Sequence, residues 1–190
     1  MHTIELLSLD AQAVRASVAV VNRITGPDLS LPTPCAQWDL GALLAHMTVQ
    51  HRGFAAAAAG HGGDPGLWVP GPLGDDPVRA YAEAAEAVLD AFAAHGADLL
   101  LPEISPAPIP RRVAIGFHLV DYVVHGWDVA SALGVGYALP DDVVAAALPI
   151  AEAVPQGAAR LQPGAAFAPA LPDPGGDPLD RILAMLGRKP

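Results

Sequence analysis

The sequence contains a single cysteine, Cys35, among its 190 residues. One cysteine cannot form a disulfide within the chain, so nothing indicates an oxidising compartment. The first ten residues carry Glu5 and Asp10, and they lack the basic start and long apolar stretch of a signal peptide. The best apolar runs, residues 55–59 and 119–124, are much shorter than the ~20 residues that span a bilayer. We therefore expect a cytoplasmic protein without a membrane segment.

Basic and aromatic side chains are also scarce. The chain has 10 Lys and Arg against 20 Asp and Glu, which gives a formal net charge of −10. Binding to nucleic acid or to an anionic membrane requires a concentrated surplus of positive charge, so we expect neither as a partner. Aromatic residues make up 5% and hydrophobic residues 52% of the sequence. The core is therefore expected to consist of small and aliphatic side chains, which suits closely packed helices.

Apolar residues recur with helical spacing, and clusters of proline and glycine separate the apolar segments. Thr3, Asp39, Asp76 and Asp177 stand where helix N-caps are expected. The expected helices span about residues 3–24, 38–59, 76–96, 112–133, 141–154 and 178–186.

No segment alternates with the period of a strand, and no unit of 20–50 residues repeats. Residues 29–37, 60–74 and 102–110 are expected to be loops, and residues 155–176 an irregular segment rich in proline, glycine and alanine. The sequence thus predicts an all-α fold: one domain over residues 1–190, built as a four-helix bundle with long connections and a short C-terminal helix.

The segment 112–133 carries the most informative polar residues. At 100° per residue, His118, Asp121, His125 and Asp128 lie on one stripe of an otherwise apolar helix. Burying an unpaired polar group costs about 1–3 kcal/mol, so this stripe needs partners. It is either exposed or hydrogen-bonded in the core, or its carboxylate and imidazole groups bind a metal ion. The i, i+4 spacing of Asp121 and His125 allows the two side chains to share one ion.

A third ligand would have to come from another helix, because a divalent metal normally has at least three protein ligands. The segment 38–59 offers His46 in an apolar context. His51 lies about 140° further round that helix, so the two histidines are not expected to face one centre. From spacing alone, a hydrogen-bonded core histidine remains the alternative to a metal ligand.

Two sequence motifs resemble those of a known protein family. The run PTPCAQWDL at residues 32–40, followed by LLAHM at 43–47, resembles the start of the mycothiol-dependent maleylpyruvate isomerase N-terminal domain family. The run at 121–130, with an acidic residue four positions before His-x-Trp-Asp, resembles the second hallmark of that family. The C-terminus at 177–188 is similar to that of short actinobacterial members. This family is part of the DinB-like superfamily of metal-binding four-helix bundles.

The resemblance implies a divalent metal, zinc or nickel, held by His46, Asp121 and His125. Such a set of two histidines and a carboxylate leaves coordination positions open, as in catalytic sites. The resemblance also implies mycothiol as a cosubstrate. The isomerase has Glu at the position of Asp121, and the shorter side chain is expected to hold an ion closer to its own helix. The resemblance therefore predicts the fold and the site more firmly than one reaction.

Five further residues are candidates for a role in the site. His118 is a candidate catalytic acid or base, a donor to a ligand or a substitute ligand, or else a surface histidine. Asp128 either orients a ligand histidine through its free ring nitrogen or pairs with an arginine. Cys35 has no identifiable base beside it, so we do not expect a nucleophile there. Trp38 and Trp127 are expected to pack in the core.

We expect a metal-dependent, mycothiol-dependent transferase or isomerase that acts on a small electrophile, so its partners are a small-molecule substrate and a low-molecular-weight thiol. Two alternatives remain: a metal-free isomerase or cyclase that uses the His and Asp side chains as acid and base, and a metal-binding protein without catalysis. The sequence leaves a homodimer open.

Overall fold

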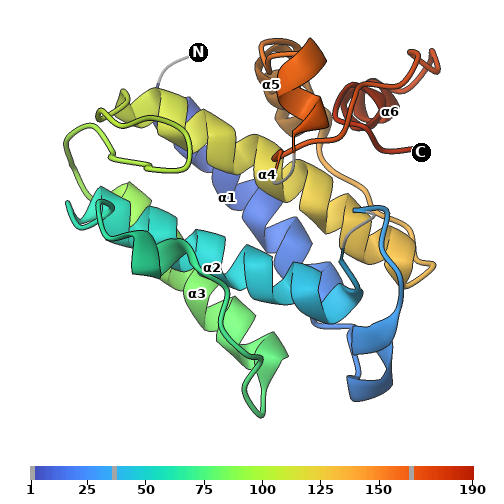
Figure 1. The fold of residues 1–190 in the computed structure, drawn as a ribbon, viewed down its shortest axis with the longest axis horizontal. Helices are drawn as coiled ribbons and strands as arrows, with labels where there is room; N and C mark the ends of the chain where they lie inside the picture. The colour runs from blue at the N-terminus through green and yellow to red at the C-terminus, as the bar shows by residue number, and fades with distance from the viewer. Residues whose placement is uncertain (1–2, 36–37, 163–164) are drawn as a thin grey trace.

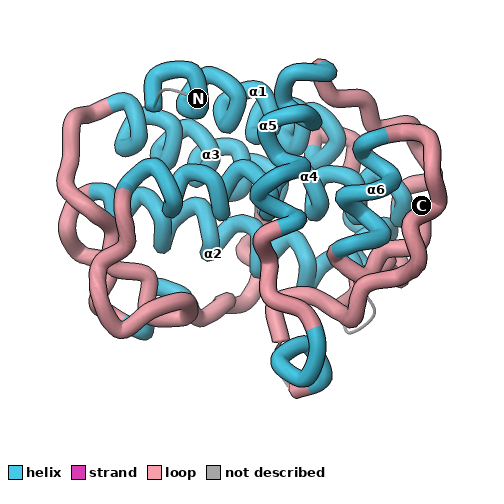
Figure 2. Tube along the Cα trace, turned by 90° about the horizontal axis from the view of Figure 1, so that it is seen from above, coloured by secondary structure: helices cyan, strands magenta, loops and turns pink. Residues whose placement is uncertain are grey.

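The computed structural model describes residues 3–35, 38–162 and 165–190. Within these ranges the chain is all-helical and has no strand, which confirms the predicted fold class (Figure 2). None of the helices in the described ranges combines the length and the apolar character needed to cross a bilayer. The helices are α1 Thr3–Val21, α2 Leu40–Ala58, α3 Pro77–Ala93, α4 Arg111–Ala132, α5 Asp141–Glu152 and α6 Pro178–Met185, with short 3-10 helices at Gly26–Ser30, Pro65–Trp68 and Gly157–Leu161.

Three of the four expected caps are confirmed. The side chains of Asp39 and Asp76 each accept a hydrogen bond from the backbone N–H three residues later, at 2.8 and 3.0 Å. Asp177 accepts one from the residue two positions later, at 2.8 Å. These bonds satisfy donors that a helix start otherwise leaves unpaired. Thr3, by contrast, is itself the first helical residue of α1.

Some segments differ from the sequence prediction. The first helix ends at Val21 rather than Ile24, because the N–H groups of Arg23 and Ile24 bond three residues back and tighten the last turn. The expected loop at 29–37 begins inside the first 3-10 helix, and its residues 36 and 37 lie outside the described part of the chain. The irregular segment at 155–176 contains the third 3-10 helix.

Two helix pairs form the bundle (Figure 1). α1 packs along α4, and α2 packs along α3, while α2 also contacts α4. α5 and α6 pack on each other, and α5 contacts both α1 and α4. Small residues allow close approach: a Cβ atom at Gly53 of α2 would lie 2.6 Å from the indole ring of Trp68, which is 5% exposed. The site described next lies where α2 and α4 face each other.

Candidate metal centre

The rotation of α4 about its axis is fixed by its apolar side. The side chains on this side are completely buried, so the helix cannot rotate about its axis without exposing them: Ile115, Leu119, Tyr122 and Val123. Tyr122 also donates a hydrogen bond of 2.6 Å to the carbonyl oxygen of Met47 on α2, which ties the two helices together. This packing determines which way the polar residues of α4 point.

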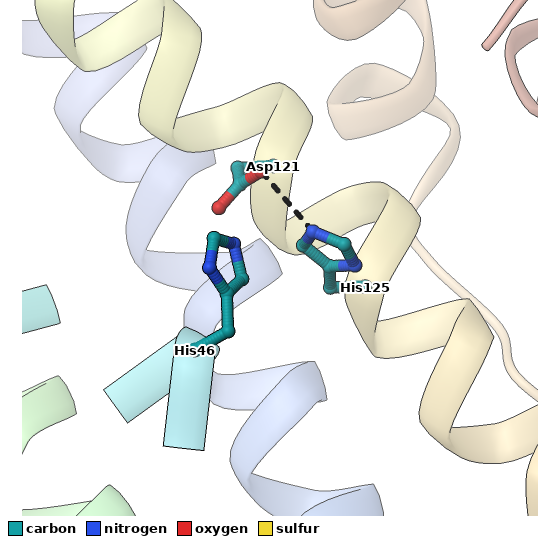
Figure 3. A group of neighbouring side chains, drawn as sticks. All are labelled: His46, Asp121 and His125. Atoms are coloured by element: carbon teal, nitrogen blue, oxygen red, sulfur yellow. Dashed lines mark ion pairs between the residues drawn. The ribbon is translucent and has the colours of Figure 1, made fainter. Parts of the chain in front are cut away.

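His46, Asp121 and His125 come together between α2 and α4 (Figure 3). One potential ligand atom from each residue lies within 4.8 Å of the other two. The Nε2 atom of His125 is 3.4 Å from Oδ1 of Asp121, one turn earlier on α4. The imidazole of His46 meets that of His125 edge to face, with ring centroids 5.2 Å apart. In the described residues this is the one such group of histidine, cysteine and acidic side chains.

The group is enclosed on one side and open on the other. The side chain of His125 is 3% exposed, whereas that of Asp121 is 21% exposed and His46 is half-buried. The indole of Trp38 covers His46, with ring centroids 4.4 Å apart. Trp38 and Trp127 are half-buried and pack against the core, and Trp38 also shields one face of the candidate ligand His46.

The protonation of His46 suits a metal ligand. Burial, reinforced by the electrostatic effects of His125 and Arg188, lowers the pKa of His46 to about 4, although Asp121 opposes the shift. The imidazole is therefore neutral near pH 7 and has a free nitrogen lone pair. Metal binding requires this neutral form.

Asp128 orients the second histidine. Its Oδ2 atom lies 2.9 Å from Nδ1 of His125, and an ionised carboxylate can only accept a hydrogen bond, so Nδ1 carries the proton. The lone pair of Nε2 then points toward Asp121 and His46. Burial would raise the pKa of Asp128, but the hydrogen bond from His125 and the positive charge of Arg188 hold it below its usual value. This arrangement of ligand, imidazole and carboxylate is the usual support of a metal-bound histidine, so the residues present fit a divalent metal.

His118 does not join this group. It is completely buried, and both of its ring nitrogens have partners: Oδ1 of Asp10 on α1 at 2.7 Å and Nδ1 of His51 on α2 at 3.1 Å. The predicted stripe spans ten residues, or about 15 Å of helix, so its two ends cannot share one site. His118 is therefore a hydrogen-bonded core residue, whereas Asp121 and His125 have the proximity that a shared metal ion requires.

Cys35 lies in the loop before α2 and is half-buried. Burial raises the pKa of its thiol, and the charges of Asp128 and Asp121 raise it further against the opposing effect of Arg188. The thiol is therefore mostly protonated at neutral pH, which agrees with the expectation that it is no nucleophile.

Sequence reasoning missed two residues of these networks, Asp10 and Arg188. Asp10 lies on the apolar face of α1, four residues after Leu6 and four before Val14, which are both buried. That placement is a signal that could have marked Asp10 as a buried partner. Arg188 follows α6 and pairs with Asp128 across 60 residues, and no local pattern predicts such a contact.

Comparisons with known proteins identify the family of the chain. An uncharacterized protein of Mycobacterium tuberculosis strain H37Rv is 28% identical over 183 residues, covering 93% of this chain and 94% of the relative. Its counterpart in strain CDC 1551 matches equally well. No solved structure matches the chain. The family model of the mycothiol maleylpyruvate isomerase N-terminal domain matches residues 11–130, which include all three candidate ligands, and the chain belongs to that family.

Proposed function

We propose that this protein is a metal-dependent enzyme that uses mycothiol, or a related low-molecular-weight thiol, to transfer or isomerise a small electrophilic substrate. The observation that carries the proposal is the convergence of His46, Asp121 and His125 within 4.8 Å at a half-exposed position. The family suggests zinc or nickel, and a set of nitrogen and oxygen ligands is compatible with either metal. Membership of the family supports the thiol.

Three protein ligands would leave at least one coordination position open for a thiol or water, and the partial exposure of Asp121 allows access from solvent. A divalent metal in such a site lowers the pKa of a coordinated thiol or water, and so supplies a nucleophile near neutral pH. The chain itself supplies the arrangement around it. His46 is a neutral donor, Asp128 fixes the tautomer of His125, and Trp38 excludes water from one side of His46.

The role of His118 as an acid or base stays a prediction. Its burial and its two hydrogen bonds favour an indirect role, in which it holds α1, α2 and α4 together. A direct role would require the substrate to enter the core. The metal-free isomerase or cyclase would use His118, Asp121 and His125 together as acid and base. The burial of His118 leaves it only Asp121 and His125 at the accessible position, whereas the metal-dependent hypothesis does not need His118.

Cobalt substitution tests the proposal. Protein purified without an affinity tag is loaded with Co²⁺, and its visible spectrum is recorded during titration with mycothiol. We expect one tightly bound ion per chain and a new sulfur-to-cobalt charge-transfer band on addition of the thiol. The metal-free protein, titrated in parallel, should show neither. A cobalt spectrum that mycothiol leaves unchanged at millimolar concentration contradicts the thiol-dependent reading and favours a metal-binding protein of another kind.

Turnover then separates the alternatives. The loaded and chelated proteins are assayed with maleylpyruvate and with 1-chloro-2,4-dinitrobenzene, a general electrophile, each with and without mycothiol. The proposal expects turnover of an electrophile only when metal and thiol are both present. Full turnover by chelated protein without thiol supports the metal-free enzyme instead.

A further inference from the structure

Asp128 is buried between two partners from distant parts of the chain. On one side it accepts the hydrogen bond from Nδ1 of His125. On the other it faces the guanidinium of Arg188: Nε lies 3.3 Å from both carboxylate oxygens, and Nη2 lies 3.0 Å from Oδ2. Asp128 is completely buried, and the side chain of Arg188 is 3% exposed. The three residues form one continuous chain from the C-terminal segment to a candidate metal ligand.

The conformation of the C-terminal segment places the side chain of Arg188 next to Asp128. Gly187 adopts a φ of +82°, a conformation that side chains other than glycine rarely adopt, and its backbone packs closely against Ala168. Arg188 then donates a further hydrogen bond of 2.9 Å to the carbonyl oxygen of Leu186 and lies 5.8 Å from the ring centroid of Phe167. The turn after α6 therefore fixes the direction of the guanidinium.

Asp128 and Arg188 each compensate the buried charge of the other. Removing one partner of a buried ion pair leaves an uncompensated charge in a low-dielectric environment, which is strongly destabilising. Without Arg188, Asp128 would have to take up a proton, turn toward water or admit water. Each of these changes alters the hydrogen bond that holds His125 in the tautomer with Nε2 free.

We propose that Arg188 is a positioning residue for the metal centre: through Asp128 it fixes the orientation of His125, and it thereby couples the docking of the C-terminal segment to metal affinity. This inference rests on the metal site of the proposed function. It adds to the site a residue that lies outside the region matched by the family model, which ends at residue 130. Because coupling is reciprocal, metal binding stabilises the docked C-terminal segment to the same extent.

Three variants test the inference: Arg188→Ala, Arg188→Lys and, as a matched control, Arg181→Ala. Arg181 lies in α6, seven residues before Arg188, but its ion pairs with Asp173 and Glu152 are exposed. The measurements are the dissociation constant of Zn²⁺, obtained by competition with a chelator, and the visible spectrum of the Co²⁺ form. Replacing the residue that supports a metal-bound histidine weakens metal binding about 10- to 100-fold. We expect that loss and an altered cobalt spectrum in Arg188→Ala, partial recovery in Arg188→Lys, and wild-type behaviour within about two-fold in Arg181→Ala.

Hydrogen exchange of the wild-type chain provides a second test, which does not require any variant to fold. Amides of residues 165–190 should exchange more slowly when Zn²⁺ is added, whereas those of α3, remote from the site, should not respond. Unchanged exchange in the C-terminal segment, or tight zinc binding by folded Arg188→Ala, overturns the inference and leaves the proposed function standing. A wild-type chain that binds no Zn²⁺ or Co²⁺ overturns both.

Discussion

Nδ1 of His51 lies 3.1 Å from Nε2 of His118, so a histidine of α2 and one of α4 are joined directly in the core. His118 is bonded in turn to Asp10 of α1, and the His51 ring stacks on Tyr122 with centroids 3.8 Å apart. Tyr81 of α3 faces the same ring at 5.1 Å. Side chains of α2, α3 and α4 therefore meet at His51, which is completely buried, and α1 is linked to it through Asp10 and His118.

This arrangement predicts loss of stability in mild acid. Burial, and then the charge of His118, hold the pKa of His51 well below 6.5 in the folded protein. In the unfolded chain the same side chain takes up a proton as the pH falls through about 6.5. The unfolded state then binds more protons than the folded state, so the free energy of unfolding decreases as the pH falls, by up to about 1.4 kcal/mol per pH unit for this group.

Urea unfolding of chelated protein between pH 7.5 and 4.5 measures this slope. His51→Phe keeps an aromatic ring against Tyr122 but cannot titrate, so its slope should be smaller by about one proton, even though its stability at pH 7.5 is lower. Equal slopes for the two proteins would show that His51 is not the group that titrates.

A second prediction concerns the ligands. His46→Ala should weaken zinc binding by more than about 10-fold, because it removes one of three ligands, and Asp121→Ala and His125→Ala should do the same. His95→Ala, which removes an exposed histidine after α3, is the control. Metal analysis of the purified variants measures the effect. Stoichiometric zinc in His46→Ala would exclude His46 as a ligand.

Metal removal gives a third prediction. An ion that joins α2 to α4 stabilises the folded state by about 2.7 kcal/mol when its concentration is 100 times the dissociation constant, which corresponds to roughly 5–10 °C in a chain of this size. Thermal unfolding with zinc and with chelator should show this difference in the wild type and in His95→Ala. It should be absent from His46→Ala, and an equal melting temperature in wild-type protein with and without zinc would place the metal elsewhere.

The sequence predicted the local parts of this structure better than the contacts between distant segments. Aspartate caps and apolar spacing act within a few residues, so Asp39 and the face of α4 could be found directly. The Asp121 and His125 pair follows from one helical turn. His46 required the family resemblance, because spacing cannot show which helices pack together. Arg188 could not be found, since its contact depends on how a long irregular segment folds back onto the bundle.

The acid sensitivity of metal binding gives a fourth prediction. Burial lowers the pKa of His46 to about 4, so protons compete with the metal at this ligand only near that pH. Trp38→Ala should expose the imidazole and raise its pKa toward 6.5. Zinc dissociation constants measured from pH 7.5 to 4.5 should therefore rise more steeply in Trp38→Ala, by one further proton released on binding. Parallel profiles would mean that Trp38 does not control the protonation of His46.

The last prediction distinguishes two possible sources of the reactive thiol: mycothiol taken up from solution and the side chain of Cys35. Because burial raises the pKa of Cys35, little of it is thiolate at neutral pH. Cys35→Ser should therefore bind zinc within about three-fold of the wild type and should give the same cobalt spectrum on titration with mycothiol. Turnover should also stay within a few-fold, whereas His125→Ala should lose it. A loss of about 1000-fold in Cys35→Ser, with metal binding intact, would instead mean covalent catalysis by this cysteine, and the exogenous thiol would no longer be needed to explain the reaction.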